Sequence, residues 1–209
     1  MEAAIAAPRI TPTITFPIGG EAVVVRSKMS RERFHAFVLE NPDWKIERDK
    51  FGTITIHPPM TFDSGYYEGE AFRLLANWSK TNPSGRVFSP STSFDLPDGS
   101  QHKADGAWVS MRKINRLSPE ERRSIASIVP EFVMEIRSES DRISTLKKKM
   151  TDVWIANGVQ LAWLLDPLKQ QAWVYRADGT SEFYDNFGHT LSGEDLLPGF
   201  SFDLRDLKI

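Results

Sequence analysis

The fold of this chain is decided by the stretch Pro130-Glu-Phe-Val-Met-Glu-Ile-Arg-Ser-Glu-Ser-Asp-Arg-Ile-Ser-Thr-Leu-Lys-Lys-Lys-Met150. Residues 132–136 are apolar except for Glu135, and such a run is typical of a central strand covered on both faces. A carboxylate in that position is costly to desolvate unless a cation or hydrogen bonds compensate its charge. A turn and a helix with three lysines follow. The sequence therefore predicts a partner for the Glu135 carboxylate, and a metal ion is one candidate.

The composition indicates one domain of ordinary globular make-up. With 209 residues the chain can bury a sizeable core, and we expect a domain over residues 29–209, preceded by an extended arm over residues 1–28. There is no cysteine, which excludes disulfides, thiolate metal sites and a cysteine nucleophile. No apolar run approaches the ~20 residues that cross a bilayer, and the first residues lack the basic start of a signal peptide. A cytoplasmic protein without a membrane partner is therefore expected.

Local patterns predict a mixed α/β architecture. Apolar residues at helical spacing favour helices over residues 30–40 and 63–78, and Ser118 with Glu121 has the capping-box spacing of a short helix. The lysine-bearing helix is expected to end at Gly158. Apolar or alternating runs predict strands over residues 22–25, 44–48, 52–57, 86–89, 92–96, 102–110, 159–166, 171–176 and 181–184, among them two antiparallel hairpins. We expect one sheet with both faces covered.

A candidate active site can be assembled from two carboxylates and one basic group. Asp105 stands just before the apolar segment 106–109, and Glu135 lies in the predicted central strand. Two carboxylates from neighbouring strands can hold a hard divalent cation through oxygen ligands. Such an ion polarises a phosphoryl oxygen and generates hydroxide from bound water, while a lysine or arginine steadies the charge of the phosphoryl group.

A helical wheel distinguishes the three consecutive lysines. With Leu146 as the reference and about 100° per residue, Lys149 falls about 60° away, at the edge of the buried stripe. Lys148 falls about 160° away and faces solvent. Lys149 is therefore best placed to reach along the sheet towards Glu135, while the other two lysines are placed to meet nucleic-acid phosphates.

Each candidate residue also has an ordinary structural interpretation. A carboxylate near a strand end is usually solvated or salt-bridged. Arg137 could pair with Glu139 or Asp141, and three consecutive lysines are most often an exposed helix face. Glu70, at the edge of the apolar stripe of helix 63–78, is more often solvated than catalytic, and Trp154 is most simply a core residue.

Several motifs, in this order along the chain, resemble the Uma-two family of endonucleases. They are Asp105-Gly-Ala-Trp-Val109, residues 130–141, Leu146-Lys-Lys-Lys-Met150, Asn157-Gly158, Trp163-Leu-Leu-Asp-Pro167 and Leu191-Ser-Gly-Glu-Asp-Leu-Leu-Pro-Gly-Phe200. The resemblance runs from about Trp44 to Phe202 and covers most of the chain. That family belongs to the PD-(D/E)XK, restriction endonuclease-like superfamily.

The resemblance implies a restriction endonuclease-like fold, with a central mixed sheet flanked by helices, and a Mg²⁺- or Mn²⁺-dependent phosphodiesterase site for DNA. Asp105 and Glu135 would be the metal ligands. The position of the superfamily lysine, two residues further on, is Arg137 here, and Lys149 matches the lysine that the Uma-two family supplies from the following helix. Glu70 matches an acidic residue of the early helix that completes the metal site.

Two hypotheses for the function follow from these residues. The first is a metal-dependent endonuclease that hydrolyses DNA phosphodiester bonds. The second is a catalytically silent nuclease fold that serves as a binding or assembly module. The net charge of −2 favours the second, because strong DNA binding normally requires a basic face. A homodimer is expected by analogy, since cutting both strands of a duplex benefits from two sites.

Overall fold

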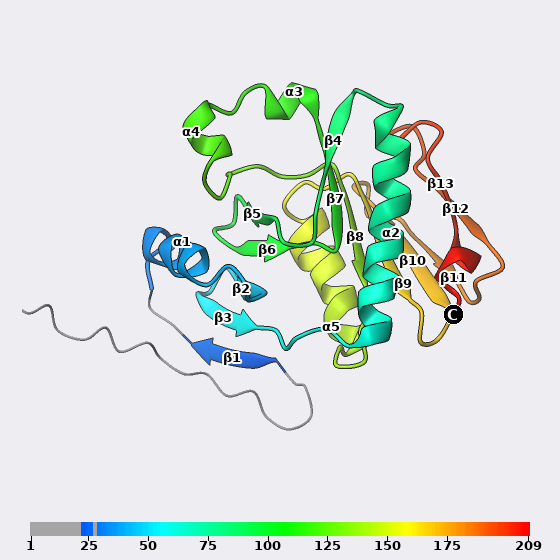
Figure 1. Cartoon of the computed structure of the whole chain (residues 1–209), viewed down its shortest axis with the longest axis horizontal. Coiled ribbons are helices and arrows are strands. Elements are labelled where there is room, and N and C mark those ends of the chain that lie inside the picture. Colours follow the sequence, from blue (N-terminus) through cyan, green and yellow to red (C-terminus); the bar gives the residue numbers. More distant parts are fainter. Residues whose placement is uncertain (1–21, 27–28) are drawn as a thin grey trace, which may run out of the picture.

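A six-stranded mixed sheet forms the centre of the protein in a computed structural model that describes residues 22–26 and 29–209 (Figure 1). Its strands lie in the order β11-β10-β9-β8-β7-β4, with β8 and β9 parallel and the other neighbours antiparallel. They are β4 (Gly85–Phe88), β7 (Gly106–Ser110), β8 (Phe132–Ile136), β9 (Leu161–Asp166), β10 (Gln171–Arg176) and β11 (Ser181–Tyr184). The predicted mixed architecture is confirmed, with β8 inside the sheet.

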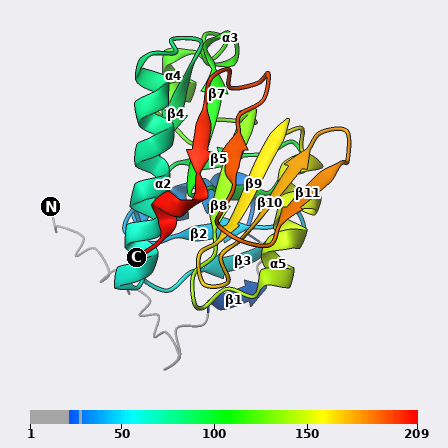
Figure 2. The same cartoon turned by 90° about the vertical axis from the view of Figure 1, so that its right-hand side faces the viewer.

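Both faces of this sheet are covered (Figure 2). One face carries α2 (Phe62–Lys80) and a C-terminal segment with β12 (Thr190–Ser192), β13 (Ser201–Asp203) and the 3₁₀ turn Leu204–Leu207. The other face carries α5 (Ile143–Lys148) and its continuation η1 (Lys149–Ile155), which is wound as a π-helix. Successive side chains of β8 alternate between the two cores, so Met134 packs on the α2 face and Val133 on the α5 face.

A second sheet of five strands corrects the prediction of a single sheet. Its order is β1-β3-β2-β6-β5, and all of its pairs are antiparallel. The strands are β1 (Val23–Arg26), β2 (Ile46–Arg48), β3 (Thr53–Ile56), β5 (Ser93–Asp95) and β6 (Gln101–Lys103). Helix α1 (Arg31–Glu40) packs Phe34 and Val38 into their core.

The two sheets separate at Asp105. Residues 102–110, predicted as one strand, divide into β6 and β7, which belong to different sheets. The last pair of β7 with β8 is Gly106 with Met134, and two residues further along β8 the Ile136 N–H donates to Asp105 Oδ2 at 2.7 Å. A side chain thus replaces the backbone as hydrogen-bond partner, which lets the chain leave the ladder while keeping a buried N–H satisfied.

The shorter elements follow their local signals. Ser118 and Glu121 form a capping box at α4 (Pro119–Arg122), which follows α3 (Met111–Ile114), and Gly158 has the positive φ of +101° that ends the lysine-bearing helix. Within the predicted arm, β1 pairs with β3, and residues 1–21 and 27–28 lie outside the described residues. In the described part of the chain no helix is long and apolar enough to cross a membrane.

Candidate active site

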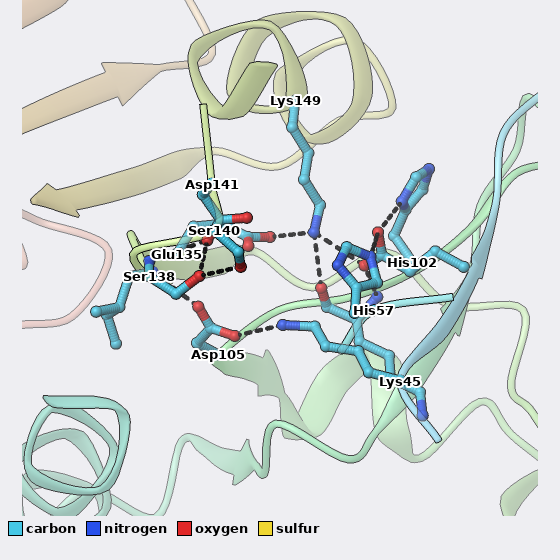
Figure 3. A network of polar contacts seen from close by, with 12 residues as sticks. Lys45, His57, His102, Asp105, Glu135, Ser138, Ser140, Asp141 and Lys149 are labelled. Carbon is cyan, nitrogen blue, oxygen red and sulfur yellow. Dashed lines mark hydrogen bonds and ion pairs between the residues drawn. The ribbon is translucent and has the colours of Figure 1, made fainter. Parts of the chain in front are cut away.

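Glu135 lies in β8 with its carboxylate buried beneath η1 (Figure 3). Lys149, the first residue of η1, places its Nζ 2.9 Å from Glu135 Oε1. The indole N–H of Trp154 donates to the same oxygen at 2.7 Å. A cation and a hydrogen bond therefore compensate the burial of this carboxylate, and the cation lies where the helical wheel places it. Trp154 is a core residue that also holds the Glu135 carboxylate.

Asp105 lies between β6 and β7, next to the end of β8. Its Oδ2 accepts the Ile136 N–H at 2.7 Å, and its Oδ1 accepts Lys45 Nζ at 2.8 Å. Lys45 comes from the segment just before β2 and was not predicted as a site residue. The carboxylate of Asp105 is therefore fixed by a backbone donor on one oxygen and by a side-chain cation on the other.

Glu47 of β2 is linked to the six-stranded sheet through Lys149, which its buried carboxylate contacts. Its Oε1 lies 2.9 Å from Lys149 Nζ and accepts the backbone N–H of Lys103 at 3.0 Å. Its Oε2 lies 3.2 Å from His57 Nε2 and 3.4 Å from His102 Nδ1. Lys149 thus contacts one carboxylate from each sheet.

A cavity of about 210 Å³ opens onto these groups. Its polar lining includes Lys45, Glu68, Asp105 and Glu135, and residues 57–61 and 138–141 form much of its remaining wall. A second cavity, of about 270 Å³, shares Lys45, Glu68 and residues 57–60 with the first and extends towards Trp44 and Lys103. The site therefore lies at the wall of two adjacent cavities that share part of their lining.

The charges perturb one another strongly. Burial raises the pKa of Glu68, and the neighbouring Asp105 carboxylate raises it further, to about 7. Burial also raises the pKa of Glu135, against the attraction of Lys149. For Glu47, burial acts to raise the pKa, but Lys149, His102 and His57 together hold the pKa of this carboxyl well below its usual range.

The pKa values of Asp105 and the two lysines follow from the same balance. For Asp105, burial acts to raise the pKa, but Lys45, the Ile136 N–H and Lys149 together lower it. Burial alone would lower the pKa of Lys45 and of Lys149, but the carboxylates around them raise both values above that of an ordinary lysine. Both lysines are therefore charged at neutral pH.

Two of the predicted residues lie away from this cluster. Arg137 forms an ion pair of 2.8 Å with Asp166 at the end of β9, rather than with the side chain of Glu139 or Asp141, and it does not line the cavity. Glu70 accepts the Arg73 Nε–H at 2.8 Å on another side of α2. The carboxylate that α2 contributes to the cavity is Glu68.

The position of Glu68 has a signal in the sequence. The buried residues of α2 are Ser64, Ala71 and Leu75, and Glu68 is four residues after the first and three before the second. It therefore belongs to the inward stripe of the helix. Glu70 is two residues further on, about 200° around the helix, and so faces elsewhere.

Comparisons with known proteins support a nuclease relationship. A family model described as "Uma2: Putative restriction endonuclease" matches residues 31–205. The chain is similar to a "putative nuclease belonging to DUF820" from Anabaena variabilis ATCC 29413, with a TM-score of 0.68 and 20% identity over 86% of this chain and 97% of that chain. This likeness confirms the predicted fold. A cryo-EM structure of a DrdV–DNA complex matches with a TM-score of 0.36 and 13% identity over 55% of this chain and 9% of that chain. No curated protein matches the chain.

Proposed function

Because the chain belongs to the Uma2 family of restriction endonuclease-like proteins, we propose that it is a metal-dependent endonuclease that hydrolyses DNA phosphodiester bonds. The observation that carries the proposal is the lining of one cavity by the carboxylates of Asp105, Glu135 and Glu68, with the Lys45 ammonium among them. Phosphoryl transfer needs positioned charge more than covalent chemistry, and this cavity concentrates charges of both signs.

The donor chemistry of the cavity fits Mg²⁺ or Mn²⁺. Carboxylate oxygens are the ligands that such hard cations prefer, and we propose that Asp105 and Glu135 hold the ion, with Glu68 as a third carboxylate. A bound divalent cation would polarise a phosphoryl oxygen and activate water. Neither Glu70 nor Arg137 is part of this proposal, because each is paired elsewhere.

The surrounding residues keep the two central carboxylates in place. The Ile136 N–H and the Trp154 indole each donate a hydrogen bond to one of them, at 2.7 Å in both cases. Lys149 adds a positive charge at Glu135. Groups fixed in this way need no reorganisation when charge develops during a reaction, which is the basis of electrostatic catalysis.

DNA is the proposed partner, and the affinity of the protein for DNA has to come from a local group of positively charged side chains. The net charge of −2 provides no general attraction to nucleic acid. Lys148 is exposed on α5, and Lys147 lies with its Nζ 4.1 Å from the centre of the Trp173 ring. These two lysines are the candidates for phosphate contacts outside the cavity. The homodimer and the cytoplasmic location stay predictions.

One observation favours the alternative of a binding or assembly module without catalysis. Asp105 and Glu135 are each paired with a lysine, and in the described residues the cavity carboxylates are not already gathered as a three-ligand metal site. Titration with Mn²⁺ in a calorimeter separates the two functions. Binding that is lost in Glu135→Gln supports the nuclease, whereas no binding by the wild type favours the module.

A cleavage assay tests the proposed function directly. Supercoiled plasmid is incubated with the protein and Mg²⁺ or Mn²⁺, with and without chelator, beside Glu135→Gln and Asp105→Asn. We expect metal-dependent nicking by the wild type and a loss of at least ~10²-fold in both variants. Glu131→Gln is the matched control, because Glu131 is an equally buried carboxylate that binds Ser110 and does not line the cavity. Cleavage that survives in both site variants would disprove the assignment.

A further inference from the structure

We infer that Lys45 is the lysine that contacts the scissile phosphate, and that Lys149 is a positioning residue for Glu135. The inference rests on the proposed nuclease function and divides the roles of the two lysines of the site. They reach the carboxylates from different sides and come from different elements, one from the segment before β2 and the other from η1 (Figure 3).

Lys149 has all three of its N–H bonds occupied. Its Nζ lies 2.9 Å from Glu47 Oε1, 2.9 Å from Glu135 Oε1 and 3.1 Å from the carbonyl oxygen of Lys103. An ammonium group has three donors, so these oxygens account for its whole hydrogen-bonding capacity. A phosphate could contact Lys149 only by displacing one of them, which would take a charged hydrogen bond away from an oxygen inside the protein.

Lys45 is held at one point and open elsewhere. Its Nζ donates to Asp105 Oδ1 at 2.8 Å, and it has no second hydrogen bond or ion pair with the residues that the structure describes. Its side chain is 30% exposed, against 12% for Lys149. Lys45 lines both cavities, whereas Lys149 lines neither. Two N–H bonds of Lys45 are therefore available to a ligand in the cavities.

The position of Lys45 between the two cavities also suits a nucleic-acid strand as the ligand. The two cavities meet at Lys45, Glu68 and residues 57–60, so a nucleotide strand that occupied both would bring a phosphate to the Lys45 ammonium. Asp105 and Glu135 line the first cavity beside it. A lysine is a common phosphate ligand, acting as a point charge with rotatable donors, and this is the role that the geometry leaves for Lys45.

Rescue by a small amine distinguishes the two lysines. Plasmid cleavage with Mn²⁺ is measured for Lys45→Ala, Lys149→Ala and the control Lys50→Ala, with and without ethylammonium. Lys50 is an exposed lysine of the same β2–β3 hairpin. We expect Lys45→Ala to lose about 10²- to 10³-fold in rate and to recover partly with ethylammonium, which can enter the open cavity. Lys149→Ala should lose activity without recovery, and Lys50→Ala should keep the wild-type rate.

A binding measurement tests the same inference without catalysis. Fluorescence anisotropy follows a labelled single-stranded oligonucleotide in Ca²⁺ at several salt concentrations. Loss of one phosphate contact reduces the slope of log K against log salt by about one, and we expect this for Lys45→Ala and not for Lys149→Ala. If Lys149→Ala does not fold, the measurement uses the double variant Lys149→Met with Glu47→Gln instead. This variant removes one charge of each sign from the protein interior.

The outcomes separate the inference from the proposed function. A wild type that cleaves nothing while Lys45→Ala shows the reduced slope contradicts the nuclease and supports the phosphate contact of Lys45. A wild-type rate and slope in Lys45→Ala overturn the inference, and so does amine rescue of Lys149→Ala alone. Mn²⁺ affinity provides a further check, because removing the Lys45 cation from Asp105 should tighten Mn²⁺ binding.

Discussion

The two sheets contribute to the site in different ways. The six-stranded sheet supplies Glu135, which is buried, and η1 supplies Lys149, whose three N–H bonds are all occupied. The segment that enters the five-stranded sheet supplies Lys45, which is partly exposed and has one partner. Asp105 lies at the junction and contacts both parts. The comparison shows that Glu135 and Lys149 form a fixed charged pair inside the protein, whereas the Lys45 ammonium can bind a ligand in the cavity.

The largest expected effect on stability comes from removing the interior cation. Lys149→Met leaves Glu47 and Glu135 buried without their shared partner, and breaking a buried pair in this way costs about 3–5 kcal/mol. Lys45→Met should cost less, because it uncovers one carboxylate instead of two, and this carboxylate, Asp105, keeps the Ile136 N–H and lines the cavity. Urea unfolding measures both losses, and equal losses would remove the distinction between the two parts.

A smaller effect tests how Glu135 is held inside the sheet. Trp154→Phe keeps a ring in the core and removes the N–H that donates to Glu135 Oε1, a hydrogen bond to a charged group worth about 1.5–3 kcal/mol. Trp163→Phe is the matched control, since Trp163 is equally buried and its Nε1 has no hydrogen-bond partner among the described residues. Denaturant unfolding of both variants isolates the hydrogen bond, and equal losses would show that the indole N–H contributes nothing.

The cavity side should respond to pH through Glu68. Its pKa of about 7 in the folded protein lies above the ordinary value of 4.5. Between pH 4.5 and about 7, Glu68 is therefore protonated in the folded protein and ionised in the unfolded chain. Stability should therefore fall as pH rises from 4.5 to about 7. Glu68→Gln stays neutral and should be the more stable protein above pH 7, by about 1 kcal/mol after allowance for solvent screening.

Thermal unfolding of the wild type and Glu68→Gln across this pH range is the measurement. The same proton competes with a cation, so Mn²⁺ affinity of the wild type should rise as pH increases through about 7. The variant should lack this part of the pH dependence. A gap in stability that is constant from pH 4.5 to 8 would contradict the raised pKa of Glu68.

The central part of the site could be predicted from the sequence because its signals are local. An apolar strand interrupted by one carboxylate predicts that the carboxylate has a partner, and helical spacing then places Lys149 near Glu135. The structure has this contact. The helix is α-helical up to Lys148, and its π-helical winding begins at Lys149. An α-helical wheel is therefore valid from Leu146 as far as Lys149.

The remaining part could not be predicted because it depends on the arrangement of two sheets. Glu47 and Lys45 come from a predicted hairpin whose first strand alternates, and alternation alone does not tell whether its charged side is solvated or buried. Once residues 102–110 divide at Asp105, the hairpin lies against the central strands, and these charges become interior or cavity-lining. Strand patterns carry no information on which sheet a strand joins, so this juxtaposition was outside local reasoning.

The smallest expected effect separates two carboxylates of one helix. Glu70→Gln removes an i,i+3 pair with Arg73, and such a pair contributes about 0.2–0.5 kcal/mol. We expect plasmid cleavage and Mn²⁺ affinity to remain at wild-type values, whereas Glu68→Gln should weaken both. The two substitutions make the same chemical change two residues apart, so only their direction from α2 differs. A loss of Mn²⁺ affinity in Glu70→Gln alone would require α2 to be turned about 160–200° from its observed packing, and the buried Ala71 and Leu75 would then face away from the core.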